Sequence, residues 1–188
     1  MNNHTETKKS FSKKVNKKKN RASVKSRVIN RKNKSTKRKW NKKAKSQFYE
    51  KYPGVVLKWP LKKNSFWISS HYGRKRKYKG KVKLHEGIDL AASSGTKVMS
   101  ANAGTVIFAG LKSGYGKIIV IEHKNNIRTV YAHLSKIFVS SGTHVKCGSI
   151  IGLVGATGNA RGSRDPSHLH FELIINDKKY NPLLHLTW

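Results

Sequence analysis

Two histidines, His168 and His170, are separated by one leucine within an apolar stretch of the sequence. In an extended strand, side chains two residues apart share a face, so both imidazoles would point to the same side. A second polar pair, His85 and Asp89, occurs earlier in the chain. If three of these four groups bind zinc, two nitrogens and one carboxylate oxygen leave a fourth tetrahedral position open to water, which is typical of catalytic zinc sites.

The segment that carries the second pair is predicted to be a strand. His85 and Asp89 are four residues apart, a spacing that suits one face of either a helix or a strand. Gly87 and the β-branched Ile88 lie between them and disfavour a helix. A third element is His133, which ends the apolar run 130–134 and would, taken alone, be interpreted as a packing residue.

The elements that must position these residues read as short strands separated by glycine, serine and asparagine turns, which predicts an all-β, antiparallel sandwich or barrel. Asn125 and Asn126 predict a tight hairpin turn. The basic stretch 74–83 is expected to be a loop, and no helix of any length is predicted. The predicted strands are 97–100, 104–109 (ended by Gly110), 116–123, 127–134, 150–154 and 169–175, the last pairing across Asn176 and Asp177 with Tyr180.

Charge divides the chain into two parts. The formal net charge is +33, and residues 1–47 hold 19 of the 41 Lys and Arg residues against the single acid Glu6. This composition predicts a disordered tail over 1–47, with the folded domain over 48–188. Such charge favours anionic partners, among them nucleic acid, anionic envelope polymers and acidic membranes. A tether to a polyanion and a merely solvated tail both remain open for 1–47.

Other compositional features exclude some classes of protein. The single cysteine, Cys147, rules out an internal disulfide and is expected to be a small core residue. No apolar stretch approaches the ~18 residues of a transmembrane helix. The N-terminal region is basic but has no apolar run of signal-peptide length, so we expect no recognisable export signal.

The histidine elements and their neighbours resemble, in order and in sequence, the LytM/lysostaphin-type zinc endopeptidases of bacterial cell walls. The resemblance covers residues from about 53 to 185. The matching segments are 85–90 (HEGIDL), 95–98 (GTKV) leading to 104–106 (GTV), 114–116 (GYG), 131–135 (YAHLS), 148–152 (GSIIG), 155–158 (GATG), 168–172 (HLHFE) and 181–182 (NP). In combination these motifs are highly specific.

The resemblance implies a site and a fold of the duplicated-hybrid-motif type. His85, Asp89 and His170 would bind one Zn²⁺ per chain, and His133 and His168 would flank the catalytic water. Either of these two histidines could act as the general base, and the sequence does not choose between them. The resemblance also implies a tyrosine upstream of His85, for which Tyr78 and Tyr72 are the candidates.

The implied function is zinc-dependent hydrolysis of peptide bonds in peptidoglycan stems or cross-links during cell-wall remodelling. The expected location is therefore the cell envelope, periplasmic or extracellular. Some members of this family have lost metal ligands and activate cell-wall amidases without cutting, but no ligand is missing here, which favours an enzyme. The alternatives are a non-catalytic regulator that uses the same cleft and a protein that binds nucleic acid or another polyanion through its tail.

Overall fold

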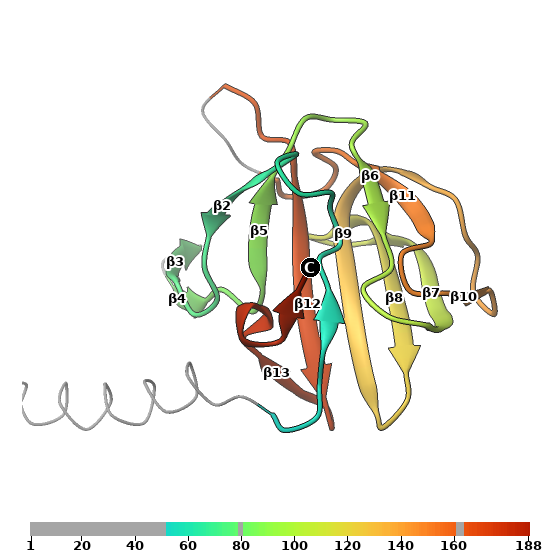
Figure 1. Ribbon diagram of the computed structural model, residues 1–188. Coiled ribbons are helices and arrows are strands. Elements are labelled where there is room, and N and C mark those ends of the chain that lie inside the picture. The colour runs from blue at the N-terminus through green and yellow to red at the C-terminus, as the bar shows by residue number, and fades with distance from the viewer. Residues whose placement is uncertain (1–51, 79–80, 161–163) are drawn as a thin grey trace, which may run out of the picture. The chain divides into compact units, whose positions relative to one another are not determined.

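The structure is a computed structural model that describes residues 52–78, 81–160 and 164–188 (Figure 1). The predicted tail over 1–47 lies outside these residues. Apart from one 3₁₀ turn, Pro182–Leu184, every regular element in the described part is a β-strand. No helix there is long and apolar enough to cross a membrane. The prediction of an all-β fold is confirmed.

The strands vary from two to eleven residues in length. In chain order they are β1 (Leu57–Lys58), β2 (Trp67–Ser70), β3 (Lys75–Tyr78), β4 (Lys81–Leu84), β5 (Ile88–Ala91), β6 (Lys97–Met99), β7 (Gly104–Lys112), β8 (Gly116–His123), β9 (Ile127–Ile137), β10 (His144–Val145), β11 (Ile150–Val154), β12 (His168–Ile175), β13 (Lys178–Tyr180) and β14 (Leu186–Thr187).

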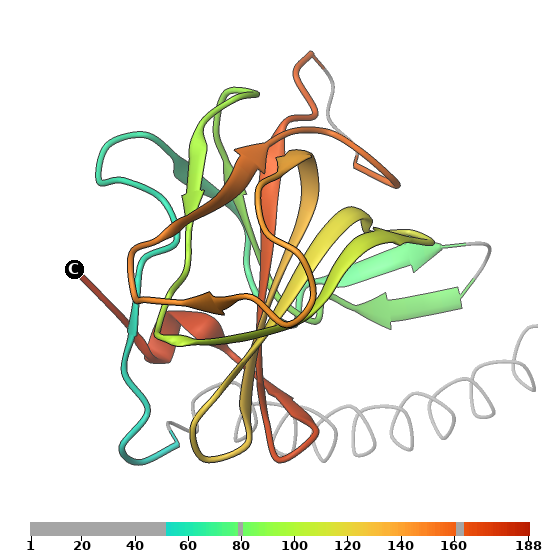
Figure 2. The same ribbon diagram turned by 90° about the vertical axis from the view of Figure 1, so that its right-hand side faces the viewer.

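The main sheet has the order β10-β7-β8-β9-β12-β5-β2, and its neighbouring strands run antiparallel. The long strand β9 pairs with β12 over its first half and with β11 over its last residues. β11 in turn pairs with β6, so these two strands form a second layer beside β7 to β9, visible in both views (Figures 1 and 2). Within the described residues the sheet is open rather than closed into a barrel, because its edge strands β10 and β2 do not pair with each other.

The core lies on one face of β12. Leu169 and Phe171 are fully buried, and they sit opposite Leu90 and Ile88 of β5. Tyr131 of β9 packs against Phe171, with 5.3 Å between ring centroids. Burial of each such side chain contributes about 1.5–3 kcal/mol. Because side chains alternate along a strand, this apolar packing fixes the register that sends the intervening polar residues of β12 to the other face.

Two hairpins agree with the sequence pattern. Asn125 and Asn126 have φ values of 61° and 55° and lie in the three-residue turn 124–126 between β8 and β9, where asparagine accepts the positive φ of a tight hairpin. β12 and β13 pair on either side of Asn176 and Asp177, as predicted.

Several local predictions were wrong. The basic stretch is not a loop, since β3 and β4 pair as an antiparallel hairpin, and charged lysines are compatible with such an edge element. Gly110 does not end its strand, because β7 keeps its ladder with β8 as far as Lys112. His85 lies in the connection between β4 and β5 rather than in a strand. Cys147 is exposed rather than buried in the core.

Candidate metal centre

Strand pairing brings two of the predicted ligands together. His170 of β12 lies directly opposite Asp89 of β5 in the antiparallel ladder, and cross-strand neighbours of this kind share a face. His168 points to the same face from two residues earlier. His85 approaches from the connection that precedes β5. All three proposed ligands are buried.

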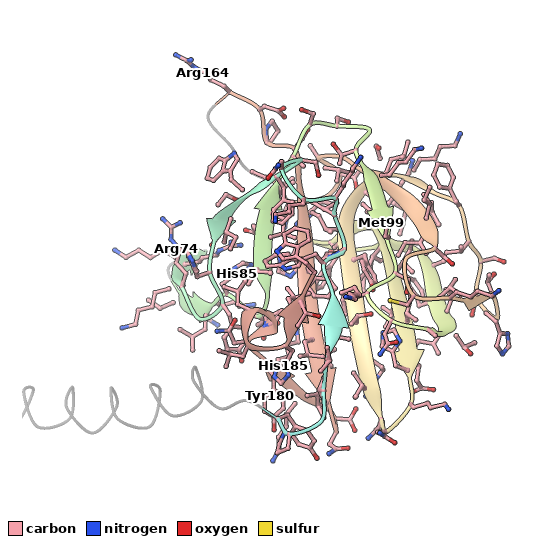
Figure 3. The ribbon with its side chains drawn as sticks, in the orientation of Figure 1. Arg74, His85, Met99, Arg164, Tyr180 and His185 are labelled. Carbon is pink, nitrogen blue, oxygen red and sulfur yellow. The ribbon has the colours of Figure 1, made fainter. Side chains whose placement is uncertain are left out.

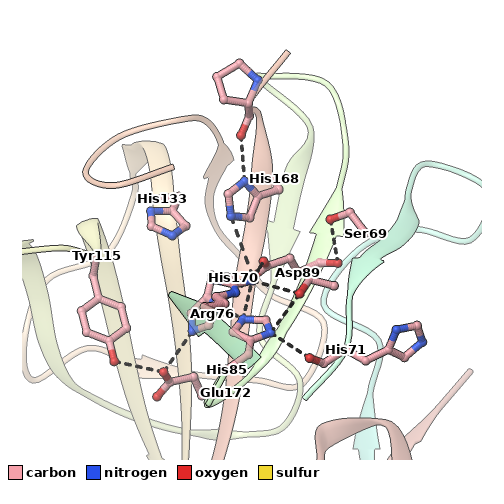
Figure 4. A network of polar contacts seen from close by, with 12 residues as sticks. Ser69, His71, Arg76, His85, Asp89, Tyr115, His133, His168, His170 and Glu172 are labelled. Atoms are coloured by element: carbon pink, nitrogen blue, oxygen red, sulfur yellow. Dashed lines mark hydrogen bonds and ion pairs between the residues drawn. The ribbon is translucent and has the colours of Figure 1, made fainter. Parts of the chain in front are cut away.

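The ligand atoms of these three residues form a tight cluster (Figure 4). His170 Nδ1 lies 2.8 Å from Asp89 Oδ1, and His85 Nε2 lies 3.0 Å from the same oxygen. The two ring nitrogens are 3.0 Å apart. These separations are close to the ~3.4 Å edge expected for ligands at zinc bond lengths of about 2.0–2.2 Å in a tetrahedron.

The outer nitrogen of each ring already has an acceptor. His85 Nδ1 donates to the His71 carbonyl at 2.9 Å, and His170 Nε2 donates to Glu172 Oε1 at 3.0 Å. The inner nitrogens therefore present lone pairs to each other and to a carboxylate oxygen. Such a cluster is stable only when a cation, either a proton or a metal ion, lies among them. The two nitrogens and one oxygen fit the ligand preference of Zn²⁺.

The close approach of His85 depends on Gly87. A Cβ atom at this position would lie 2.4 Å from the Phe171 carbonyl oxygen and 3.0 Å from His170 Cε1. Only glycine lets the connection between β4 and β5 pass this close to β12. Gly87 is thus part of the architecture of the candidate centre.

A buried polar network, which the sequence did not reveal, supports His170. Glu172 accepts from the Tyr115 hydroxyl at 3.0 Å and pairs with Lys179 Nζ at 3.0 Å. Burial on its own raises the pKa of Glu172, but the His170 and Lys179 contacts outweigh it and hold the pKa below the usual value. The available signal was spacing, because Glu172 is two residues beyond His170 on the same strand and therefore on the same face.

Asp89 is held from its other side. Arg76 of β3 forms an ion pair with Asp89 Oδ2 and donates to Ser70 Oγ at 3.0 Å. Although burial raises the pKa of Asp89, its close contacts with the His170 and His85 rings lower that pKa well below its ordinary range. The carboxylate is therefore ionised, with Oδ1 aimed at the two imidazoles. Arg76 was missed because it falls in the stretch that was predicted to be a loop.

His168 and His133 lie beside the cluster, with their ring centroids 4.7 Å apart. His168 Nδ1 donates to the Pro166 carbonyl at 2.7 Å, and its Nε2 lies 3.8 Å from Asp89 Oδ1. His133 Nδ1 donates to the Thr157 carbonyl at 2.8 Å. These bonds fix the tautomers, so Nε2 of each ring carries the free lone pair.

A backbone irregularity sets the direction of His133. Its φ is 63°, and the ladder between β8 and β9 shifts register at this point. An extra residue of this kind bends a strand and re-aims a side chain. Burial lowers the pKa of His133 to about 4, so the ring is neutral near pH 7.

The two histidines open onto a cleft. One cavity, of about 540 Å³, is lined by Asp89, His133 and His168 together with β3, and a second, of about 550 Å³, is lined by His85, His170 and Tyr115. Of the two tyrosine candidates, Tyr72 donates its hydroxyl to the Lys179 carbonyl at 2.8 Å. The side chain of Tyr78 lies outside the described part of the chain.

Comparison with known proteins identifies the family. Residues 83–182, which include all five candidate residues, match the model of peptidase family M23. The chain belongs to this family. The resemblance inferred from the sequence motifs is thereby confirmed.

Individual relatives agree with this assignment. The chain is 44% identical over 101 residues to the DD-carboxypeptidase/endopeptidase Mpg of Neisseria meningitidis, covering 54% of this chain and 22% of that protein. It is similar in structure to a zinc-containing peptidase from Vibrio cholerae, with a TM-score of 0.61 and 36% identity over 68% of this chain and 39% of that one. For the catalytic domain of lysostaphin from Staphylococcus simulans the TM-score is 0.57 and the identity 31%, over 64% of this chain and 91% of that domain.

Proposed function

We propose that this chain is a zinc-dependent endopeptidase that hydrolyses peptide bonds in peptidoglycan stems or cross-links. The observation that carries the proposal is the convergence of three buried ligand atoms beside two further histidines at a cleft. The other ring nitrogen of each proposed histidine ligand, His85 and His170, is already hydrogen-bonded to an acceptor. The names of the relatives, a DD-carboxypeptidase/endopeptidase and a zinc-containing peptidase, support the substrate class and the metal. Because the chain spans only 22% of the first of these relatives, the activity of the whole protein is part of the proposal.

In this proposal His85, Asp89 and His170 hold the metal. When bound, Zn²⁺ would act as a Lewis acid that polarises the scissile carbonyl and lowers the pKa of water towards about 7. Glu172 keeps His170 in the tautomer that turns Nδ1 inward, and the His71 carbonyl does the same for Nε2 of His85. Arg76 orients Asp89 from behind.

His168 and His133 handle the proton. Each is anchored through Nδ1 and presents a free Nε2 towards the cleft, which is the arrangement of a general base. In the attack step one Nε2 takes the proton of the nucleophilic water, and the resulting imidazolium can return it to the leaving amine. The ring that has taken the proton would also stabilise the negative charge that develops on the carbonyl oxygen.

The site of action follows from the substrate. Peptidoglycan lies outside the cytoplasm, so the protein would act in the cell envelope, either periplasmic or extracellular. The basic tail, residues 1–47, would bind anionic envelope polymers in this proposal, but these residues lie outside the described part of the chain. A protein that only binds polyanions needs positive charge and has no use for four histidines and an aspartate grouped at a cleft. This grouping therefore favours the endopeptidase over a polyanion-binding protein.

Digestion of purified peptidoglycan tests the proposal. We expect the wild-type protein to release soluble muropeptides that carry new amino termini, and mass spectrometry of these fragments identifies the bond cut. Cleavage on the peptide side, with intact glycan strands, is the expected pattern. A zinc-loaded, folded protein that releases nothing from peptidoglycans of different cross-link chemistry would instead be a non-catalytic regulator.

A further inference from the structure

The cavity that contains Asp89, His133 and His168 has a strongly basic wall. Four consecutive residues, Arg74, Lys75, Arg76 and Lys77, line it, and all four are exposed. Among the described lining residues Asp89 is the one acid, and its charge is already paired with that of Arg76. A ligand in this cavity therefore experiences a net positive field.

The wall is the edge of a strand rather than its face. Arg74 directly precedes β3, whereas Lys75, Arg76 and Lys77 lie within it, and side chains of consecutive strand residues point to opposite faces. A cavity that touches all three strand residues therefore borders the edge of the strand. β3 pairs with β4, and across the described residues it has no second partner strand. Its free edge therefore offers backbone N–H and C=O groups to an extended peptide, in the manner of β-strand addition. Figure 3 shows Arg74 on the flank of the domain formed by this hairpin.

Two of the four cations are not committed to the site. The guanidinium of Arg76 is engaged with Asp89 and Ser70. By contrast, Arg74 and Lys77 form no ion pair with any residue that the structure describes. Both line the cavity, Arg74 just before β3 and Lys77 within it, so their charges are available to a ligand that lies beside the candidate metal centre.

We propose that Arg74 and Lys77 recognise a free carboxylate of the substrate peptide and so select anionic, extended peptides for the cleft. This inference rests on the proposed function, because it concerns the peptide cut at the adjacent centre. Peptide stems carry free carboxylates, and charge-assisted hydrogen bonds to such groups are about twice as strong as neutral ones. The planar guanidinium of Arg74 matches a carboxylate in a two-pronged contact, and Lys77 adds a point charge.

Calorimetric titration of the zinc-loaded full chain tests the inference by binding alone. The probes are a stem tetrapeptide with its free carboxylates and the same tetrapeptide with each carboxylate converted to a carboxamide. We expect the acid to bind about tenfold more tightly than the amide, as one charge-assisted contact provides. The double variant R74Q/K77Q should bind both peptides equally. The matched variant K97Q/K124Q removes the same charge from exposed lysines that do not line the cavity, and it should keep the tenfold preference.

Each outcome decides the inference separately from the proposed function. Equal binding of acid and amide by the wild type, or an undiminished preference in R74Q/K77Q, would overturn it. Loss of the preference in K97Q/K124Q as well would also overturn it, because net charge rather than the strand edge would then be responsible. Peptidoglycan digestion by the same wild-type sample is measured in parallel, so a failure of carboxylate recognition in an active enzyme leaves the endopeptidase proposal standing.

Discussion

His170 and Glu172 lie on the same face of one strand, with Nε2 of the imidazole 3.0 Å from Oε1 of the carboxylate. This bond turns the other ring nitrogen, Nδ1, towards Asp89 at 2.8 Å. The orientation of the proposed metal ligand is therefore set by a residue two positions along the chain. Lys179 and Tyr115 fix that residue in turn.

Replacing Glu172 with glutamine should weaken zinc binding without removing a ligand. The amide oxygen can still accept from His170, but the negative charge that makes the ring a better ligand is lost. Loss of such a partner typically costs about 10- to 100-fold in metal affinity. Competition with a chelating dye measures the zinc affinity. Glu122→Gln, at an exposed position of β8, is the matched control and should bind zinc like the wild type; equal affinity in the two variants would refute the role of Glu172.

Alanine variants should separate metal binding from proton transfer. His168→Ala and His133→Ala are expected to retain one zinc per chain. Replacement of the residue that acts as general base should lower kcat by about 100- to 10,000-fold. His85→Ala should lose the metal together with the activity. Zinc content by elemental analysis and digestion kinetics are measured on the same samples. If His168→Ala and His133→Ala both lose zinc, these residues are ligands and the division of roles is wrong.

A methyl group at Gly87 should disturb the centre. Alanine would place its Cβ 2.4 Å from the Phe171 carbonyl oxygen, so the connection before β5 must move. We expect Gly87→Ala to lower the free energy of unfolding, measured in urea, by about 1–3 kcal/mol, which is the usual cost of overpacking. We also expect this variant to bind zinc more weakly. Gly110→Ala is the control, since its nearest neighbour would be an aromatic carbon of Phe108 at 3.5 Å. A Gly87→Ala variant as stable and as zinc-competent as the control would show that the close approach is dispensable.

His123, remote in sequence from the site, should make folding sensitive to acid. Burial lowers its pKa from the model-peptide value of 6.5, and the ring contacts the Ala103 carbonyl and the Thr129 hydroxyl, each at 2.8 Å. The unfolded chain therefore binds a proton more readily than the folded one. The contribution of the neutral His123 ring to the free energy of unfolding is fully present above pH ~6.5. It is lost as the pH falls towards the lowered pKa of His123 in the folded protein.

The measurement is the free energy of unfolding of zinc-loaded protein at pH 7.5 and at pH 5.5. The decrease between these two values should be smaller for His123→Gln than for the wild type. His144→Gln, at an exposed position of β10, is expected to follow the wild type. An unchanged decrease in His123→Gln would contradict the assignment.

The all-β fold could be predicted from short-range pattern, whereas the residues of the candidate centre were implied by the resemblance of the motifs to a known family. Alternation along β12 places His168 and His170 on one face. The positive φ of Asn125 and Asn126 forms the turn of the β8–β9 hairpin. The comparison with family M23 matches the region that the motifs indicated. The roles of the individual side chains stay predictions until the variants above are measured.

The features that the sequence did not reveal depend on contacts between distant segments. The re-aiming of His133 needs a register shift against β8, which no local pattern encodes. Arg76 reaches Asp89 only because β3 and β4 pair, and a run of like charges suggested a loop instead. Lys179 joins Glu172 across the β12–β13 hairpin, and the local sequence around Lys179 does not indicate this partly buried ion pair.

Zinc titration of the chelator-treated protein tests the central claim most directly. Peptide bonds cleaved in purified peptidoglycan are followed as zinc is added back in fractions of the protein concentration. We predict no cleavage in the chelated sample, and a rise that saturates at one zinc per chain, the number that His85, Asp89 and His170 can hold. Full cleavage by the chelated protein, or none at saturating zinc, would contradict a zinc-dependent endopeptidase.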